Sequence, residues 1–185
     1  MKIIFLDFDG VINDLLTFNS VNRNNVMILK KIIELTDAKV VVTSSNKYSF
    51  QRPYSENNKE ETQCYTLYIE ELNKNGITIH DFTSYVNANR EQEILEYLKS
   101  HPDIEQYLIL DDDYVIESCK EHEVYLDLQS GLREEHIIPA LNILNGKLKF
   151  YHDTDNLDET QEERIIRMNQ KIQELQHRYL EDEGR

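Results

Sequence analysis

The chain has 185 residues and a formal net charge of −15 at pH 7, because 35 Asp and Glu outnumber 20 Lys and Arg. Such acidity disfavours a broad surface for the backbone of a long nucleic acid, which would depend on Lys and Arg, but it leaves the end of a nucleic acid open as a partner. A hydrophobic fraction of 39% is enough for a buried core, which excludes wholesale disorder, and the length suits one domain with a short appendage.

The first ten residues, MKIIFLDFDG, contain an apolar run that aspartates interrupt. This run is too short and too charged for a signal peptide or a membrane span. We therefore expect a cytoplasmic protein with no membrane partner. The two cysteines, Cys64 and Cys119, lie far apart and lack the spacing of a zinc site or a disulfide scaffold, which agrees with a reduced compartment.

Apolar runs and helical periodicities alternate along most of the chain. Continuous apolar strands between helices are typical of a parallel sheet with helices on both faces, so the predicted fold is a doubly wound, Rossmann-like α/β domain. The predicted elements in chain order are a strand at 2–8, a helix at 21–36, a strand at 39–43, a helix at 91–99, a strand at 107–110, a helix at 114–122, a short strand at 124–126 and a helix at 133–144.

Two segments differ from this pattern. Residues 45–89 follow the second strand in a polar, tyrosine-containing stretch with one helical part, which predicts a small insertion in a core of residues 1–150. Residues 155–183 predict a separate amphipathic helix, because apolar residues recur there every three or four positions, as in about two heptads. So short a seam leaves two interpretations open, a homodimer through this helix or a helix folded back along its own domain.

Acidic and hydroxyl side chains follow three of the predicted strands at the point where each strand ends. In a parallel sheet, ligands bind beyond the carboxyl ends of the strands, so these side chains are candidates for one site. They are Asp7 and Asp9 after the strand at 2–8, Thr43 and Ser44 after the strand at 39–43, and Asp111, Asp112 and Asp113 after the strand at 107–110.

Several carboxylates at one edge of a sheet would repel one another unless a cation lay among them, since nearby like charges raise each other's pKa. Mg²⁺ is the expected cation, because it takes oxygen ligands and is usually held by one or two carboxylates together with substrate phosphate oxygens. The pattern therefore indicates a magnesium site that binds a phosphorylated substrate.

The strings FLDFDGV at residues 5–11 and LDDD at 110–113, with a hydroxyl-ended strand and a basic residue between them, resemble the haloacid dehalogenase-like (HAD) superfamily of aspartate-nucleophile phosphohydrolases. The resemblance covers residues 1–145. It implies a phosphatase in which Asp7 forms an aspartyl-phosphate. It also implies that Asp9 first protonates the leaving group and then activates the attacking water.

The resemblance implies a set of metal ligands as well. Asp111 and Asp112 match the acidic pair of the fourth motif, and they would hold Mg²⁺ together with Asp7 and the backbone carbonyl of Asp9. Asp113 would support these ligands without binding the ion itself.

Further residues would contact the phosphate or the rest of the substrate. The hydroxyl of Thr43 would bind the phosphoryl oxygens, with the adjacent Ser44 as the alternative. Ser44 and Gly10 are expected to contact the substrate, and Gly10 would also let the chain turn sharply after the first motif.

The third motif of the superfamily is a cation that neutralises the phosphoryl group and orders the nucleophile. Arg90 is the preferred candidate, because it begins a predicted helix ahead of the acidic strand end. Lys47 and Arg52, both in the predicted insertion, are the alternatives.

Within the superfamily, the string TSSN, a helix of the form R-x-x-E-I-x-x-x-L, LDDD and a later SGL are most similar to small bacterial HAD domains, relatives of which occur beside RNA-repair modules. That group more often has Trp where this chain has Asn46. Since the gaps between motifs are modest, we expect an open or minimally capped site, which suits a substrate large enough to exclude water by itself.

The sequence-based hypothesis is a Mg²⁺-dependent phosphatase that hydrolyses a phosphomonoester of a nucleotide, a nucleic-acid end or a phosphoprotein through an aspartyl-phosphate. Two alternatives stay open. One is a non-catalytic, metal-binding regulatory or interaction module, and the other is a phosphotransferase whose acceptor is not water.

Overall fold

The computed structural model describes residues 1–17, 20–47, 59–86, 89–113 and 116–152. Residues Met1–Asp153 form one compact unit, and Thr154–Arg185 form a second unit. The predicted helix at 155–183, and with it the predicted homodimer, lies outside the described residues. In the described ranges, we find no helix with the length and apolar character that crossing a membrane requires.

The core of the first unit is a six-stranded sheet in which every neighbouring pair of strands is parallel. The strands are β1 (Lys2–Leu6), β2 (Lys39–Val42), β3 (Ile79–Phe82), β4 (Gln106–Asp111), β5 (Glu123–Tyr125) and β6 (Tyr151–His152). Their order across the sheet is β3-β2-β1-β4-β5-β6, so β1 and β4 are neighbours although they are distant in the chain. This is the order of a doubly wound α/β fold, and it confirms the predicted fold class.

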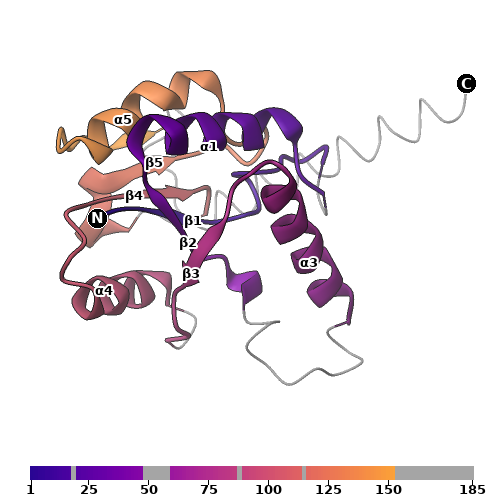
Figure 1. Ribbon diagram of the computed structural model, residues 1–185, viewed down its shortest axis with the longest axis horizontal. Coiled ribbons are helices and arrows are strands. Elements are labelled where there is room, and N and C mark those ends of the chain that lie inside the picture. The colour runs from indigo at the N-terminus through magenta and orange to yellow at the C-terminus, as the bar shows by residue number, and fades with distance from the viewer. Residues whose placement is uncertain (18–19, 48–58, 87–88, 114–115, 153–185) are drawn as a thin grey trace, which may run out of the picture. The chain divides into compact units, whose positions relative to one another are not determined.

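Helices cover both faces of the sheet. Among the described residues, the α-helices are α1 (Arg23–Thr36), α3 (Lys59–Lys74), α4 (Arg90–Ser100) and α5 (Ile137–Leu144), and the 3₁₀ turns are η1 (Ser45–Lys47), η3 (Glu117–His122) and η4 (Glu134–His136). Figure 1 shows α1 and α5 on one side of the sheet and α4 on the other.

The alternation of β1 divides the core into two layers, because successive side chains of a strand point to opposite faces. Ile4 and Leu6 belong to the larger core cluster, which also contains residues of α1, α3 and α5. Ile3 and Phe5 belong to the second cluster with residues of α4 and η3. All four of these β1 side chains are fully buried, so β1 is a central strand that is covered on both faces.

The ends of α1 follow local chemistry. The Asn22 side chain accepts a hydrogen bond from the Asn24 N–H, which satisfies a donor that the first helical turn leaves unpaired. At the other end, Asp37 has a left-handed backbone with φ of 55°, and its N–H bonds to the Ile33 carbonyl. The helix predicted at 21–36 is therefore present with its N-terminus two residues later.

The structure contains two strands that the sequence did not predict, β3 and β6. β3 has no continuous apolar run, since His80 and Asp81 are exposed in its middle. Both strands lie at the edges of the sheet, where one side of a strand has no neighbour to bury it. Much of the segment 45–89 is therefore a regular crossover, because α3 connects β2 to the parallel strand β3.

Two predicted helices are also shorter than expected. Where a helix was predicted at 114–122, the described residues contain the 3₁₀ turn η3, Glu117–His122. The helix predicted at 133–144 starts with the 3₁₀ turn η4, and its α-helical part covers only Ile137–Leu144. Helical periodicity does not distinguish a tight 3₁₀ turn from the start of an α-helix.

Candidate active site

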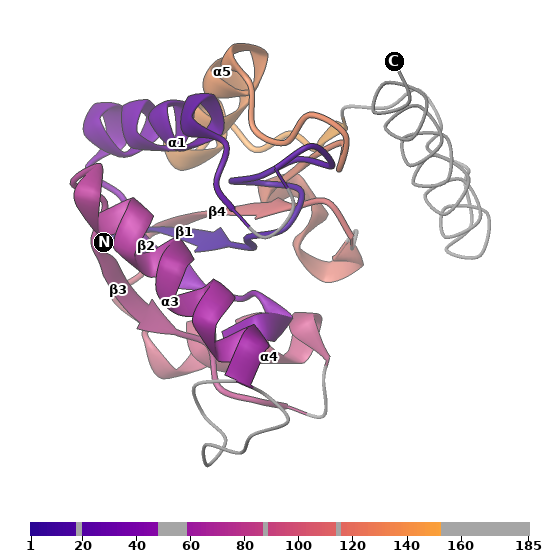
Figure 2. The ribbon, with the colours of Figure 1, turned by 90° about the vertical axis from the view of Figure 1, so that its right-hand side faces the viewer.

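The register of β1 and β4 brings two aspartates together. Leu6 is paired with Leu110, so Asp7 and Asp111 follow at the same level of the sheet, and the Asp7 N–H donates to the Leu110 carbonyl at 3.0 Å. In Figure 2 the arrows of β1 and β4 point the same way, which places both strand ends at one edge.

Three carboxylates meet at this edge. Asp7, Asp111 and Asp112 each offer one oxygen atom, and these atoms lie within 4.8 Å of one another. All three side chains are buried. Burial raises the pKa of Asp111, and the neighbouring charge of Asp7 raises it further.

Gly10 permits the close approach of the loop after β1 to this group. Its φ is +67°, and a Cβ atom at this position would lie 2.2 Å from the Cγ of Asp112. Any larger residue would therefore displace the Asp112 carboxylate. This packing explains the need for glycine, whereas the predicted contact of Gly10 with the substrate stays a prediction.

Arg90, the first residue of α4, reaches the same group. Its Nη1 lies 3.2 Å from Asp7 Oδ2 and also contacts Asp111 Oδ2, and its Nη2 donates to Ser45 Oγ at 3.2 Å. Burial of the guanidinium opposes its charge, but the carboxylates of Asp111 and Asp7 outweigh burial and raise the pKa of Arg90 well above its usual value. The cation thus stays charged beside the predicted nucleophile.

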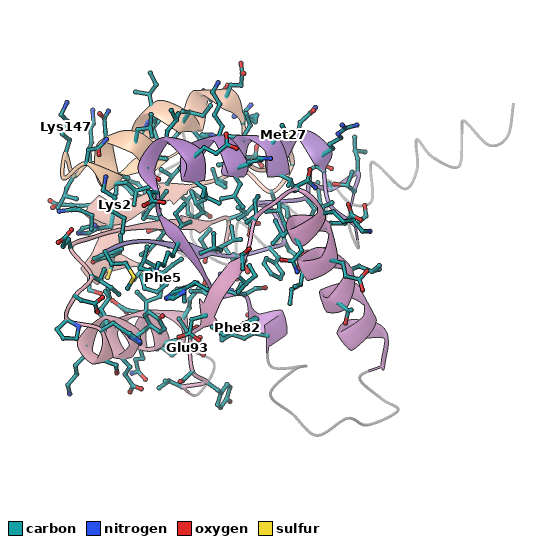
Figure 3. All side chains as sticks on the ribbon, viewed as in Figure 1. Lys2, Phe5, Met27, Phe82, Glu93 and Lys147 are labelled. Carbon is teal, nitrogen blue, oxygen red and sulfur yellow. The ribbon has the colours of Figure 1, made fainter. Side chains whose placement is uncertain are left out.

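Lys47, the alternative to Arg90, points to a different partner. Its Nζ lies 2.6 Å from Glu93 Oε2, both side chains are fully buried, and the ammonium also donates to the Thr43 carbonyl at 3.0 Å. Figure 3 labels Glu93 on α4, close to Phe82 at the end of β3. Because Arg90 contacts Asp7 and Lys47 is paired with Glu93, the geometry favours Arg90 as the cation of the third motif. Arg52, the other alternative, lies outside the described residues.

Thr43 lies directly after β2, next to the carboxylates of β1. Its N–H donates to the Leu6 carbonyl at 2.9 Å, which fixes the loop against β1. Its hydroxyl is buried and has no hydrogen-bond partner among the described residues, whereas buried polar atoms normally have one. A ligand oxygen would satisfy this hydroxyl. Ser44 is buried beside it, and the unsatisfied hydroxyl favours Thr43 over Ser44 as the phosphate-binding residue.

The side chain of Asp9 is separate from the three-carboxylate group and binds two other residues. Asp9 Oδ1 accepts a hydrogen bond from Asn13 Nδ2 at 2.8 Å and another from the Tyr68 hydroxyl at 3.2 Å. The expected contact between the Asp9 carbonyl and Mg²⁺ stays a prediction.

Sequence reasoning did not connect Asn13, Tyr68 or Asn25 with the first motif. The buried Asn25 of α1 donates to the carbonyls of Val11, Asn13 and Ser130, and so ties the loop after β1 to a distant turn. For Asn25, the one available signal was that a polar residue lies on the apolar face of the predicted helix at 21–36. No sequence motif marks such a residue as functional.

The comparison with protein families agrees with this geometry. Residues 3–137, from β1 to the first residue of α5, match a family described as "HAD domain in Swiss Army Knife RNA repair proteins". No curated protein gave a significant match to the chain. The match confirms the resemblance inferred from the motifs, and HAD membership supports a phosphohydrolase type of function in general. With the parallel sheet, the paired strand ends and a match over most of the described core, the chain belongs to the family of HAD domains found in Swiss Army Knife RNA repair proteins.

Proposed function

We propose that the protein is a Mg²⁺-dependent phosphatase that hydrolyses a phosphomonoester through a phosphorylated Asp7. The observation that carries this proposal is the buried group of three carboxylates, Asp7, Asp111 and Asp112, with Arg90 in contact with two of them. A purely structural role for so much buried charge would be costly, because each desolvated ion needs a partner.

The donor set fits a hard divalent ion. Asp7, Asp111 and Asp112 supply carboxylate oxygens within bridging distance of one another, and oxygen is the ligand type that Mg²⁺ prefers. These three residues would hold the ion. When bound, Mg²⁺ would neutralise the repulsion between the carboxylates and an incoming phosphate.

The residues of the chain divide the reaction between them. One carboxylate oxygen of Asp7 bonds to phosphorus while the bond from phosphorus to the leaving oxygen breaks, and Asp9 gives its proton to that leaving oxygen. Water then attacks phosphorus, Asp9 takes a proton from this water, and the bond to Asp7 breaks to release inorganic phosphate. Arg90 and the Thr43 hydroxyl would bind the phosphoryl oxygens throughout.

We propose the terminal phosphate of an RNA as the substrate. The support is the family, whose description connects these domains with RNA repair. The net charge of −15 fits an RNA end better than a long stretch of RNA, because few phosphates would then lie near the acidic surface.

The test compares phosphate release from a phosphorylated oligoribonucleotide, a phosphopeptide and 4-nitrophenyl phosphate, with Mg²⁺ and with EDTA. We expect release with Mg²⁺ and none with EDTA, and the RNA end should have the highest kcat/KM. Asp7→Asn should lower kcat by about a thousandfold or more, because the amide cannot act as the nucleophile.

Asp103→Asn is the matched control, since Asp103 is exposed in the loop before β4 and its variant should keep full activity. Release of phosphate by Asp7→Asn at the rate of the control would refute the nucleophile. If the unchanged protein releases no phosphate from any of the three substrates, the non-catalytic interpretation replaces this one.

A further inference from the structure

Asp9, the proposed acid and base, is held by two residues from different parts of the chain. Asn13 lies four positions after Asp9, in the loop that follows β1, whereas Tyr68 comes from α3. The Asn13 Nδ2 also donates to the Tyr68 hydroxyl at 3.1 Å, so the three side chains bind one another in a closed triangle.

The orientation of the Asn13 amide is fixed by the backbone. The Gly10 N–H donates to Asn13 Oδ1 at 2.8 Å, so the carbonyl side of the amide faces Gly10. Its NH₂ group therefore faces Asp9 and can only donate. Asn13 is fully buried, which strengthens these bonds by excluding water.

The position of the Tyr68 side chain is fixed by burial and by packing against Phe8. Its side chain is 2% exposed, and its ring packs edge-on against Phe8 with 5.4 Å between ring centroids and 80° between ring planes. Phe8 is the residue between Asp7 and Asp9. The ring contact and the hydroxyl of Tyr68 therefore act on the same short stretch of the first motif.

We propose that Tyr68 and Asn13 are positioning residues that aim the carboxyl group of Asp9 at the leaving oxygen of the substrate. This inference rests on the proposed phosphatase function. Both hydrogen bonds reach the same oxygen, Oδ1, so together they fix the direction of the Asp9 side chain. The proton of Asp9 moves to the leaving oxygen as the bond between that oxygen and phosphorus breaks, and a proton from the attacking water restores it in the second step.

The discriminating measurement uses two substrates of similar shape, phenyl phosphate and 4-nitrophenyl phosphate. Phenoxide is the more basic leaving group and needs protonation more, so its release depends more on a well-aimed Asp9. Tyr68→Phe keeps the ring against Phe8 and removes only the hydroxyl. It should lower kcat/KM for phenyl phosphate about tenfold and for 4-nitrophenyl phosphate less than about twofold.

Tyr97→Phe is the matched control. The Tyr97 hydroxyl also donates to an aspartate, Asp81, at 3.0 Å, but neither residue belongs to the proposed catalytic machinery. Its loss should leave the ratio of the two kcat/KM values unchanged. Thermal unfolding of both variants would show that each one folds.

A second test places Tyr68→Phe in an Asp9→Asn background. If Tyr68 acts through Asp9, its removal has no further effect on phenyl phosphate once the acid is gone. An equal loss for both substrates, or an undiminished loss in the Asp9→Asn background, would overturn the positioning role while leaving the phosphatase proposal intact. Absence of turnover in the unchanged protein would instead overturn both.

Discussion

Arg90 is the residue on which the charge balance of the site depends. It is one buried cation in contact with Asp7 and Asp111, and it contacts both through Nη1. An arginine so placed stabilises the carboxylates in the absence of metal, and it contacts two of the three residues that would hold Mg²⁺. Its effect on stability should therefore depend on whether the ion is present.

Arg90→Met should lower the free energy of unfolding in EDTA by about 3–5 kcal/mol, because it leaves buried carboxylates without their partner. Excess Mg²⁺ should recover much of this loss, since an ion that binds only the folded state stabilises it by mass action. Thermal unfolding with and without Mg²⁺ measures both effects.

The control is Arg133→Met, which removes an ion pair with Glu135 on the surface. Exposed pairs contribute about 0–1 kcal/mol, and no Mg²⁺-dependent recovery is expected there. The idea fails if the two variants respond alike to Mg²⁺.

Glu123, the first residue of β5, makes stability depend on pH. Burial raises its pKa from 4.5 to about 8, and the charge of Asp111 adds to this shift. The folded protein thus keeps a proton that the unfolded chain releases, so stability falls as the pH rises from about 4.5 to about 8. Glu123→Gln has no proton to lose and keeps an oxygen that can accept from the Ile116 N–H.

In EDTA, Glu123→Gln should therefore have nearly the Tm of the unchanged protein at pH 5 and a higher Tm at pH 8. The comparison of Tm differences between variant and unchanged protein cancels the titration of other groups. Glu34→Gln, at an exposed position beside Lys30, should give no difference that changes with pH between 5 and 8. If the Tm difference between Glu123→Gln and the unchanged protein were the same at pH 5 and pH 8, the raised pKa of Glu123 would be contradicted.

At the scale of residues, the sequence predicted site residues only where a polar side chain directly follows an apolar strand. Asp7 and Asp111 follow apolar runs directly, so their place at one edge of a parallel sheet could be predicted. The bond between Tyr68 and Asp9 joins residues 59 positions apart, and no local pattern encodes such a contact. This contact could be predicted only if the position of α3 beside the first motif were already known.

At the scale of elements, the buried pair of Lys47 and Glu93 connects η1 to α4. Glu93 also accepts from the Thr83 hydroxyl at 3.3 Å, so the end of β3 joins the same connection. Burial lowers the pKa of Lys47, and the bond to Glu93 opposes that shift. The pair therefore fixes the loop that carries Thr43 relative to the helix that carries Arg90.

Lys47→Met should destabilise the protein by about 3–5 kcal/mol, because it leaves the charge of Glu93 buried alone. The double variant Lys47→Met/Glu93→Leu should be more stable than the sum of the two single losses indicates, since no unpaired charge remains. Urea unfolding of the three variants measures this coupling. Additive losses would show that the two side chains do not act as a pair.

The elements also explain which parts of the fold were predictable. β1, β2 and β4 are buried on both faces and read as continuous apolar runs. β3 is an edge strand that carries exposed His80 and Asp81, so its sequence resembles a loop. Its place became evident only from the pairing with β2, which also shows that α3 is part of the core layers.

At the scale of the whole molecule, composition and pattern were enough to predict the fold class, because a doubly wound sheet imposes apolar strands between helices throughout the chain. The match of residues 3–137 to one family agrees with that architecture. The contacts within the candidate site could not be predicted in the same way, since they depend on which buried groups share a hydrogen bond or an ion pair.

The central position of β1 has a consequence for how the site comes into being. Both neighbours of β1 occur later in the chain than β1 itself, and β4 is separated from it by α1, β2, α3, β3 and α4. Asp7, the proposed nucleophile, therefore acquires its companion carboxylates only after a loop of that size has closed, which is a slow, non-local event in folding. A nascent chain or a proteolytic fragment that ends before β4 would possess Asp7 and Asp9 but would lack Asp111 and Asp112, so the proposed phosphatase activity would appear only once β4 has joined the sheet.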